Sequence, residues 1–127
     1  MKVCLAGTSI KEEILKEHNV KYFLESFYSI QDWQIPYIKK AELFLLDSGA
    51  FTFMNNFKGT INWKEYIDRY AEFIIKHDIK YFFELDIDVI VGYNKVKEYT
   101  KYLESKVGRQ CIPVWHKSRG IEEWKRI

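Results

Sequence analysis

The sequence predicts an α/β fold in which helices connect the strands of a parallel sheet. Short apolar runs alternate with longer segments of helical periodicity, at intervals of about 20 to 35 residues, as in βαβ units. Hydrophobic residues make up 47% of the 127-residue chain, which is enough for one domain with its own core. Two architectures fit this alternation, a doubly wound open sheet and a (β/α)8 barrel.

The motifs and the length favour a partial barrel. No G-x-G-x-x-G follows the first apolar run, which disfavours the dinucleotide-binding version of the open sheet. A complete TIM barrel typically needs about 250 residues, and the roughly five strands expected here are little over half of one. The last helix is unfinished, so we expect a truncated barrel whose exposed sheet edges leave the chain marginally stable or prone to aggregation.

The first half of the chain carries three predicted strands. They lie at residues 2–7, 21–28 and 43–47. Ser9 with Glu12 resembles a capping box for a helix that runs to about His18. A short helix is expected within residues 29–42, where Pro36 leaves its bounds open.

The clearest helical signal lies in the second half. Asn62 and Glu65 form a capping box, and an amphipathic helix then runs to about Lys76. Its apolar residues at helical spacing are Trp63, Tyr66, Ile67, Tyr70, Phe73 and Ile74. The other expected elements are a loop at 55–59, a strand at 80–88, a helix at 95–107 ended by Gly108, a strand at 111–116 and the start of a helix at 121–127.

Composition narrows the classes of function. The formal net charge of +2 permits nucleic-acid binding but does not argue for it, because dedicated nucleic-acid-binding proteins usually carry a much larger positive net charge. Cys4 and Cys111 sit in apolar runs, so we expect buried free thiols, which suit a reducing cytoplasm. No run approaches a membrane span. With no C-x-C-x-x-C or H-E-x-x-H motif, no metal or cofactor is predicted, although acids alone leave a carboxylate-bound Mg²⁺ open.

Acidic residues gather where the third and fourth predicted strands end. Since strand side chains alternate faces, Glu84, Asp86 and Asp88 should share the inward face with Phe82. The other face of that strand should pack under the helices, through Tyr81, Phe83, Leu85, Ile87 and Val89. Asp47 should point from the neighbouring strand toward the same opening of the barrel, its mouth at the carboxyl ends of the strands. Ligands of parallel sheets bind at this end.

The pair of Asp47 and Asp86 is the strongest candidate for chemistry. Carboxylates that share a partly desolvated site repel one another, so at least one should have a raised pKa, which suits acid–base work or the binding of an N–H-rich ligand. Each acid alone fits helix capping or a solvated turn equally well. Glu84 lies deeper and is a candidate to pair with a Lys or Arg, and Asp88 fits a loop.

Small and aromatic residues add to this mouth. Ser48, Gly49 and Ala50 make a turn in which backbone N–H groups can approach a ligand closely. Phe51 beside them fits either the core or a stacking surface for a flat ring. His116, at the end of the fifth predicted strand, fits either a substrate contact or a structural role.

Three strand-end motifs occur here in the same order and spacing as in one known family. Asp47 to Phe51 (Asp-Ser-Gly-Ala-Phe) resembles the Asp-Ser-Gly-Gly-aromatic motif of the queuine/archaeosine tRNA-guanine transglycosylases. With Leu85-Asp86 and the Ile-Pro-Val-Trp-His run at 112–116, nearly the whole chain looks like the N-terminal part of the phage-type queuine tRNA-ribosyltransferase-like proteins.

The resemblance implies a (β/α)8 barrel that exchanges guanine for a 7-deazaguanine in tRNA or DNA. It implies that Asp47 is the acid–base group, that Phe51 stacks on the purine, and that Asp86 accepts hydrogen bonds from the base edge, as a carboxylate can from two donors. Ser48, Gly49 and Ala50 would line the pocket. It also implies a cytoplasmic enzyme, in the host cytoplasm if phage-encoded, with no membrane partner.

The chain departs from the family pattern in ways that limit its activity. Ala50 replaces the second Gly, Thr52 the following Gln, and residues 114–117 the Val-Gln-Gly-Gly segment. The family's nucleophilic Asp and zinc-binding cysteines would lie beyond Ile127, so we expect the chain to be inactive in base exchange with labelled guanine. Two alternatives remain: a barrel glycosidase or phosphodiesterase using Asp86 with Glu84 or Asp88, and a non-catalytic base-binding fragment.

Overall fold

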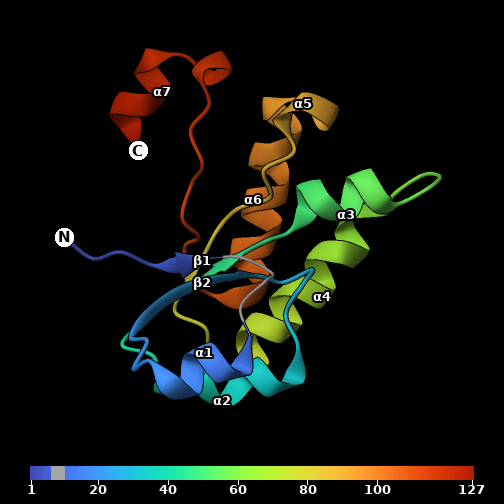
Figure 1. The fold of residues 1–127 in the computed structure, drawn as a ribbon. Coiled ribbons are helices and arrows are strands. Elements are labelled where there is room, and N and C mark those ends of the chain that lie inside the picture. The colour runs from blue at the N-terminus through green and yellow to red at the C-terminus, as the bar shows by residue number, and fades with distance from the viewer. Residues whose placement is uncertain (7–10) are drawn as a thin grey trace.

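The strands pair in the order in which they occur in the chain. The computed structural model describes residues 1–6 and 11–127. It is a mixed α/β fold with a parallel sheet of order β1-β2-β3-β4, and the described residues form seven α-helices (Figure 1). The strands are β1 (Leu5–Ala6), β2 (Tyr22–Ser26), β3 (Leu43–Asp47) and β4 (Tyr81–Phe82). A parallel bridge from Phe83 to Ile112 extends this order by one segment.

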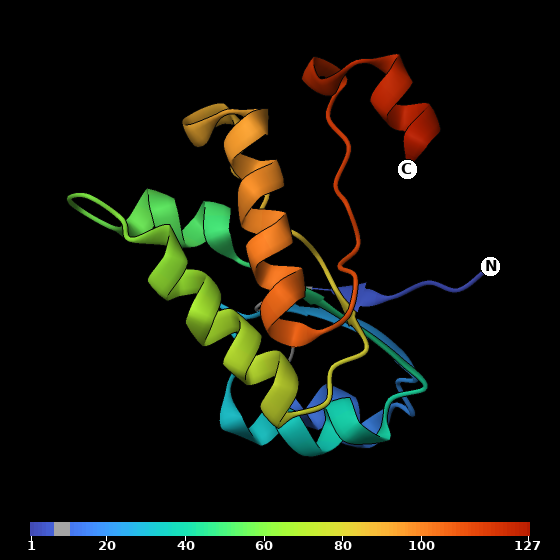
Figure 2. The same ribbon diagram turned by 180° about the vertical axis from the view of Figure 1, so that it is seen from behind.

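Of the helices in the described residues, four connect successive strands and three follow β4. They are α1 (Glu12–Glu17), α2 (Ile35–Lys40), α3 (Ala50–Asn56), α4 (Trp63–Lys76), α5 (Asp88–Val91), α6 (Tyr93–Val107) and α7 (Ile121–Arg126), with 3-10 turns at Asp32–Gln34 and Lys117–Arg119. Figure 2 shows the two long helices, α4 and α6, side by side. The Asn62 side chain accepts from the Glu65 N–H at 3.2 Å and so begins α4, as predicted. Gly108, in the left-handed region, ends α6 as predicted.

One face of the sheet forms the core with the helices. Phe23, Leu46 and Phe82 on this face join one apolar cluster with residues of α2, α4 and α6. The Tyr70 hydroxyl of α4 donates to the backbone oxygens of Leu46 at 3.2 Å and Phe83 at 2.9 Å, which ties the helix to β3 and β4. The buried interior is therefore on the helical side of the sheet.

The other face of the sheet is more open. The register aligns Leu24 with Leu45, and Leu45 with Tyr81, on this face. The leucines are half-buried and Tyr81 is 48% exposed. Parallel sheets normally bury both faces, so an apolar open face is unusual.

The fourth strand is much shorter than predicted, and its faces are reversed. Because Phe82 aligns with the fully buried Leu46, Phe82 and Glu84 face the helices, whereas Tyr81 faces the open side. The predicted inward direction of Glu84 is therefore wrong. Beyond Glu84 the chain leaves the ladder and α5 begins at Asp88. Leu85 and Ile87 are buried as predicted, but Val89, expected under the helices, lies in α5 and is 79% exposed.

The predicted strand at 111–116 contributes only its bridge at Ile112. Pro113 has no N–H to give, and the Val114 N–H donates to the Glu84 carboxylate at 3.0 Å instead of to a strand. The strand predicted at 2–7 is reduced to β1, while residue 7 and the Ser9 capping box lie outside the described residues.

Several other elements can be compared with their predictions. The strand predicted at 21–28 is β2, and the short helix expected within 29–42 is present as a 3-10 turn followed by α2. Helix α3 replaces the start of the loop predicted at 55–59. Both cysteines are free as predicted. Cys111 is also buried as predicted, whereas Cys4 is only half-buried.

Candidate functional site

The site lies at the carboxyl ends of β3 and β4. Asp47 is the last residue of β3, and Asp86 follows β4 by four residues. Burial raises the pKa of Asp47, a hydrogen bond from the Gly49 N–H at 3.2 Å opposes this, and the negative charge of Asp86 raises it further. The raised pKa of one member of this pair agrees with the expectation from the sequence. An acid of this kind keeps its proton to a higher pH than an ordinary aspartate.

The turn after Asp47 needs a glycine. Gly49 has φ of 68°, and a Cβ there would lie 2.6 Å from Tyr28 Cβ and 2.9 Å from the Tyr28 nitrogen, besides overlapping Ser26 Oγ. Ser48 is buried, and its carbonyl oxygen accepts from the Tyr66 hydroxyl at 2.5 Å. The Gly49 N–H donates a hydrogen bond to Asp47 Oδ2, so a contact within the turn stabilises its conformation.

Phe51 lies outside the core. It is the second residue of α3 and is 50% exposed, whereas Ala50 before it is buried. The core alternative for Phe51 is thereby excluded. An exposed aromatic ring that follows a buried turn is available to a flat ligand.

Asp86 and His116 are in contact, so the structure brings together two of the residues singled out from the sequence. His116 Nε2 lies within hydrogen-bonding distance of Asp86 Oδ1. Among the described residues, no hydrogen bond to the other Asp86 oxygen, Oδ2, is formed. A ligand with two N–H donors would therefore meet one free oxygen and one that is shared with His116.

Arg119 is the residue that sequence reasoning missed. Its side chain is 2% exposed, and Nη1 donates to Glu84 Oε1 at 2.7 Å. Nε and Nη2 donate to both oxygens of Asp88, each at 2.6 Å. Glu84 thus pairs with an arginine, which was one of its two expected roles. The only hint in the sequence was that several acids in one short stretch need a cation.

Asp86, Asp88 and His116 could also be considered as metal ligands. One ligand atom from each lies within 4.8 Å of the others. Asp88, however, already accepts two hydrogen bonds from Arg119, and a guanidinium beside the cluster disfavours a second cation. We assign no metal to this group.

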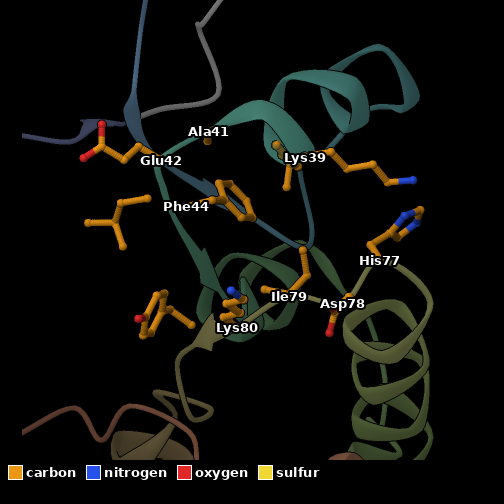
Figure 3. Close-up of a pocket in the computed structure, with 11 residues that line it drawn as sticks. Lys39, Ala41, Glu42, Phe44, His77, Asp78, Ile79 and Lys80 are labelled. Carbon is orange, nitrogen blue, oxygen red and sulfur yellow. The ribbon is translucent and has the colours of Figure 1, made fainter.

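A pocket of about 400 Å³ lies at the other end of the sheet. Figure 3 shows Phe44 and Ile79 among the side chains that line it, with Lys39 and His77 at one side. It is at the amino ends of β3 and β4 and includes neither Asp47 nor Asp86. In α/β folds of this kind, ligands bind at the carboxyl ends, so we place the candidate site there.

In comparisons with protein-family models, curated proteins and solved structures, nothing matches this chain. Among the helices of residues 1–6 and 11–127, none has the length and apolar character required to cross a bilayer.

Replacing Asp47 with asparagine is expected to stabilise the fold at neutral pH. Because burial raises the pKa of Asp47, the folded state disfavours its charged form, and this cost is full above the folded-state pKa. The gain should be clear near pH 7 and vanish below about pH 4, the ordinary aspartate range, where both states are protonated. Urea unfolding at several pH values measures it, with the exposed Glu72→Gln as the control. No gain at pH 7 would contradict the raised pKa.

Proposed function

We propose that this chain is the N-terminal part of a guanine transglycosylase-like (β/α)8 barrel, and that its strand ends bind guanine or a 7-deazaguanine. The observation that carries the proposal is the position of Asp47 at the end of β3, where the charge of Asp86 after β4 raises its pKa, together with the exposed Phe51 that follows it in the chain. Within the proposal the base belongs to tRNA or DNA.

The sheet supports a barrel over a doubly wound fold. Its strands are parallel and follow in sequential order without a reversal, and the Phe83–Ile112 bridge continues that order. Doubly wound sheets change direction at a switch point, whereas barrel strands follow one another around the ring. The open apolar face, with Leu24, Leu45 and Tyr81, suits the interior of a barrel that further strands would close.

The chemistry of the strand ends supports a purine ligand. A guanine-like base presents an N1–H and an amine, which a carboxylate such as Asp86 can accept. Phe51 can cover the flat face of the base, and Asp47, with its raised pKa, can exchange a proton with it. Ser48, Gly49 and Ala50 would form the floor.

The glycosidase or phosphodiesterase alternative is less well supported. It needs Glu84 or Asp88 as a partner for Asp86, but both are bound to the buried guanidinium of Arg119. A base-binding chain without turnover remains the second candidate. The observation that favours it is that Glu84 and Asp88 are already paired with Arg119, which leaves Asp86 as the acid of residues 84–88 that can contact a base.

Binding of guanine, measured by calorimetry, tests the proposal. Phe51→Ala should weaken binding by about 1–3 kcal/mol, the usual contribution of stacking a base on an aromatic ring. Phe57→Ala is the matched control, because Phe57 is 44% exposed at the other end of α3. Asp86→Asn should weaken binding of guanine but not of adenine, which lacks the N1–H and 2-amine. Equal loss in both phenylalanine variants, or no guanine binding, would contradict the proposal.

A further inference from the structure

Arg119 and its two acids form a buried ionic group that is held by hydrogen bonds. The Arg119, Glu84 and Asp88 side chains are 2%, 6% and 9% exposed. Besides Arg119, Glu84 accepts from Thr100 Oγ1 of α6 at 3.0 Å and from the Val114 N–H at 3.0 Å. Burying charges is costly unless they are paired and hydrogen-bonded. The positions of these three side chains relative to one another are therefore tightly constrained.

The two acids stand on either side of Asp86 in the chain. Glu84 lies two residues before it and Asp88 two residues after it, and both bind the same guanidinium. The backbone between them belongs to neither β4 nor α5. Leu85 and Ile87 are buried, so Asp86 is directed away from the core between two fixed ends.

The segment that carries Arg119 also carries the partner of Asp86. His116 contacts Asp86, and the Arg119 N–H donates to the His116 carbonyl oxygen at 2.9 Å through a 3-10 turn. The segment from Val114 to Arg119 therefore contacts residues 84–88 at three points. The contacts are made by Val114, His116 and Arg119. Arg119 also lies 4.5 Å from the centre of the Tyr93 ring, which packs its guanidinium at the start of α6.

We propose that Arg119 is the positioning residue of the base-binding site: its guanidinium, through Glu84 and Asp88, fixes the direction of the Asp86 carboxylate and its contact with His116. The inference rests on the proposed function in one respect, that the ligand of Asp86 is a base. By pairing Glu84 and Asp88, Arg119 also leaves Asp86 as the acid of this stretch that faces a ligand. Lysine cannot replace it, because an ammonium group lacks the planar fork that reaches two carboxylates at once.

The side-chain NMR signals of the histidines test the inference without any ligand. The chain has three histidines, so His18 and His77 serve as internal references for His116. The Asp86→Asn variant serves as a reference, because it gives the positions of the His116 ring signals without the carboxylate partner. Arg119→Lys should move these signals toward that position and leave the other two histidines unchanged. Arg126→Lys changes a 66% exposed side chain that pairs with Glu123, and it should move none of them.

A second variant covers the case in which Arg119→Lys does not fold, as judged by circular dichroism. Asp88→Asn removes one charge of the group and should move the His116 signals in the same direction by a smaller amount. Wild-type positions of the His116 signals in the folded Arg119→Lys protein, or in Asp88→Asn, would overturn the inference. Equal movement of all three histidines would also overturn it, because that indicates a general loss of structure.

Guanine affinity separates this inference from the proposed function. Arg119→Lys should bind guanine at least about tenfold more weakly than the unchanged chain, as metal affinity falls when a group that orients a metal-ligating side chain is removed. If the unchanged chain binds no guanine while the His116 signals still move, the proposed function fails and the positioning role stands. If guanine binds equally well in both proteins, the positioning role fails and the proposed function stands.

Discussion

Replacing Arg119 with methionine is expected to lower the free energy of unfolding by about 3–5 kcal/mol, the usual cost of removing one partner from a buried ionic group. Methionine fills a similar volume but leaves Glu84 and Asp88 buried without their cation. Urea unfolding at pH 7 measures the loss.

Two further variants make this result specific. Arg126→Met removes an arginine whose side chain is 66% exposed from its ion pair with Glu123, and it should leave the stability essentially unchanged. Adding Glu84→Gln and Asp88→Asn to Arg119→Met should recover part of the loss, because neutral groups need no cation. If Arg119→Met loses no more unfolding free energy than Arg126→Met, the buried ionic group does not stabilise the fold and the prediction is contradicted.

Replacing Gly49 with alanine should be nearly as damaging. A left-handed backbone costs an ordinary residue about 1–2 kcal/mol, and overpacking of a tight site adds about 1–3 kcal/mol. The added Cβ would lie 2.6 Å from Tyr28 Cβ, where neither backbone can yield without moving β2 or β3. Because Gly49 connects Asp47 to Phe51, guanine binding should be lost with the stability.

Gly108→Ala is the matched control for this prediction. Gly108 has φ of 80°, close to the 68° of Gly49, but a Cβ added to Gly108 would meet no atom within 4 Å. The Gly108 variant therefore carries the backbone cost alone. Thermal unfolding of both variants isolates the effect of the close approach to Tyr28, and an equal loss in the two proteins would contradict it.

Local patterns in the sequence were sufficient for β3 and α4. The apolar run from Leu43 ends at an acid and matches β3 at both bounds, and the Asn62 cap with its helical stripe matches α4 to Lys76. In both elements the residues that define the structure are close together in the chain, so periodicity and capping describe them well.

The region after β4 could not be predicted in the same way. Alternating acids at 84–88 resemble one face of a strand, but Glu84 and Asp88 bind an arginine 35 and 31 residues away in the chain. A pairing at that distance leaves no periodic signal, and it changes both the end of the strand and the direction of Glu84. The site itself was only partly predictable: the Asp86–His116 contact joins two residues that were singled out separately.

The position of guanine in crystals of this chain tests the central claim most directly. Crystals soaked with guanine should show the purine with its N1–H edge on Asp86, one face against the ring of Phe51, and Asp47 within reach of the base. Parallel soaks with a simple sugar should leave the same place without bound ligand. A sugar bound between Asp47 and Asp86, or guanine bound only at the amino ends of β3 and β4, would contradict the claim.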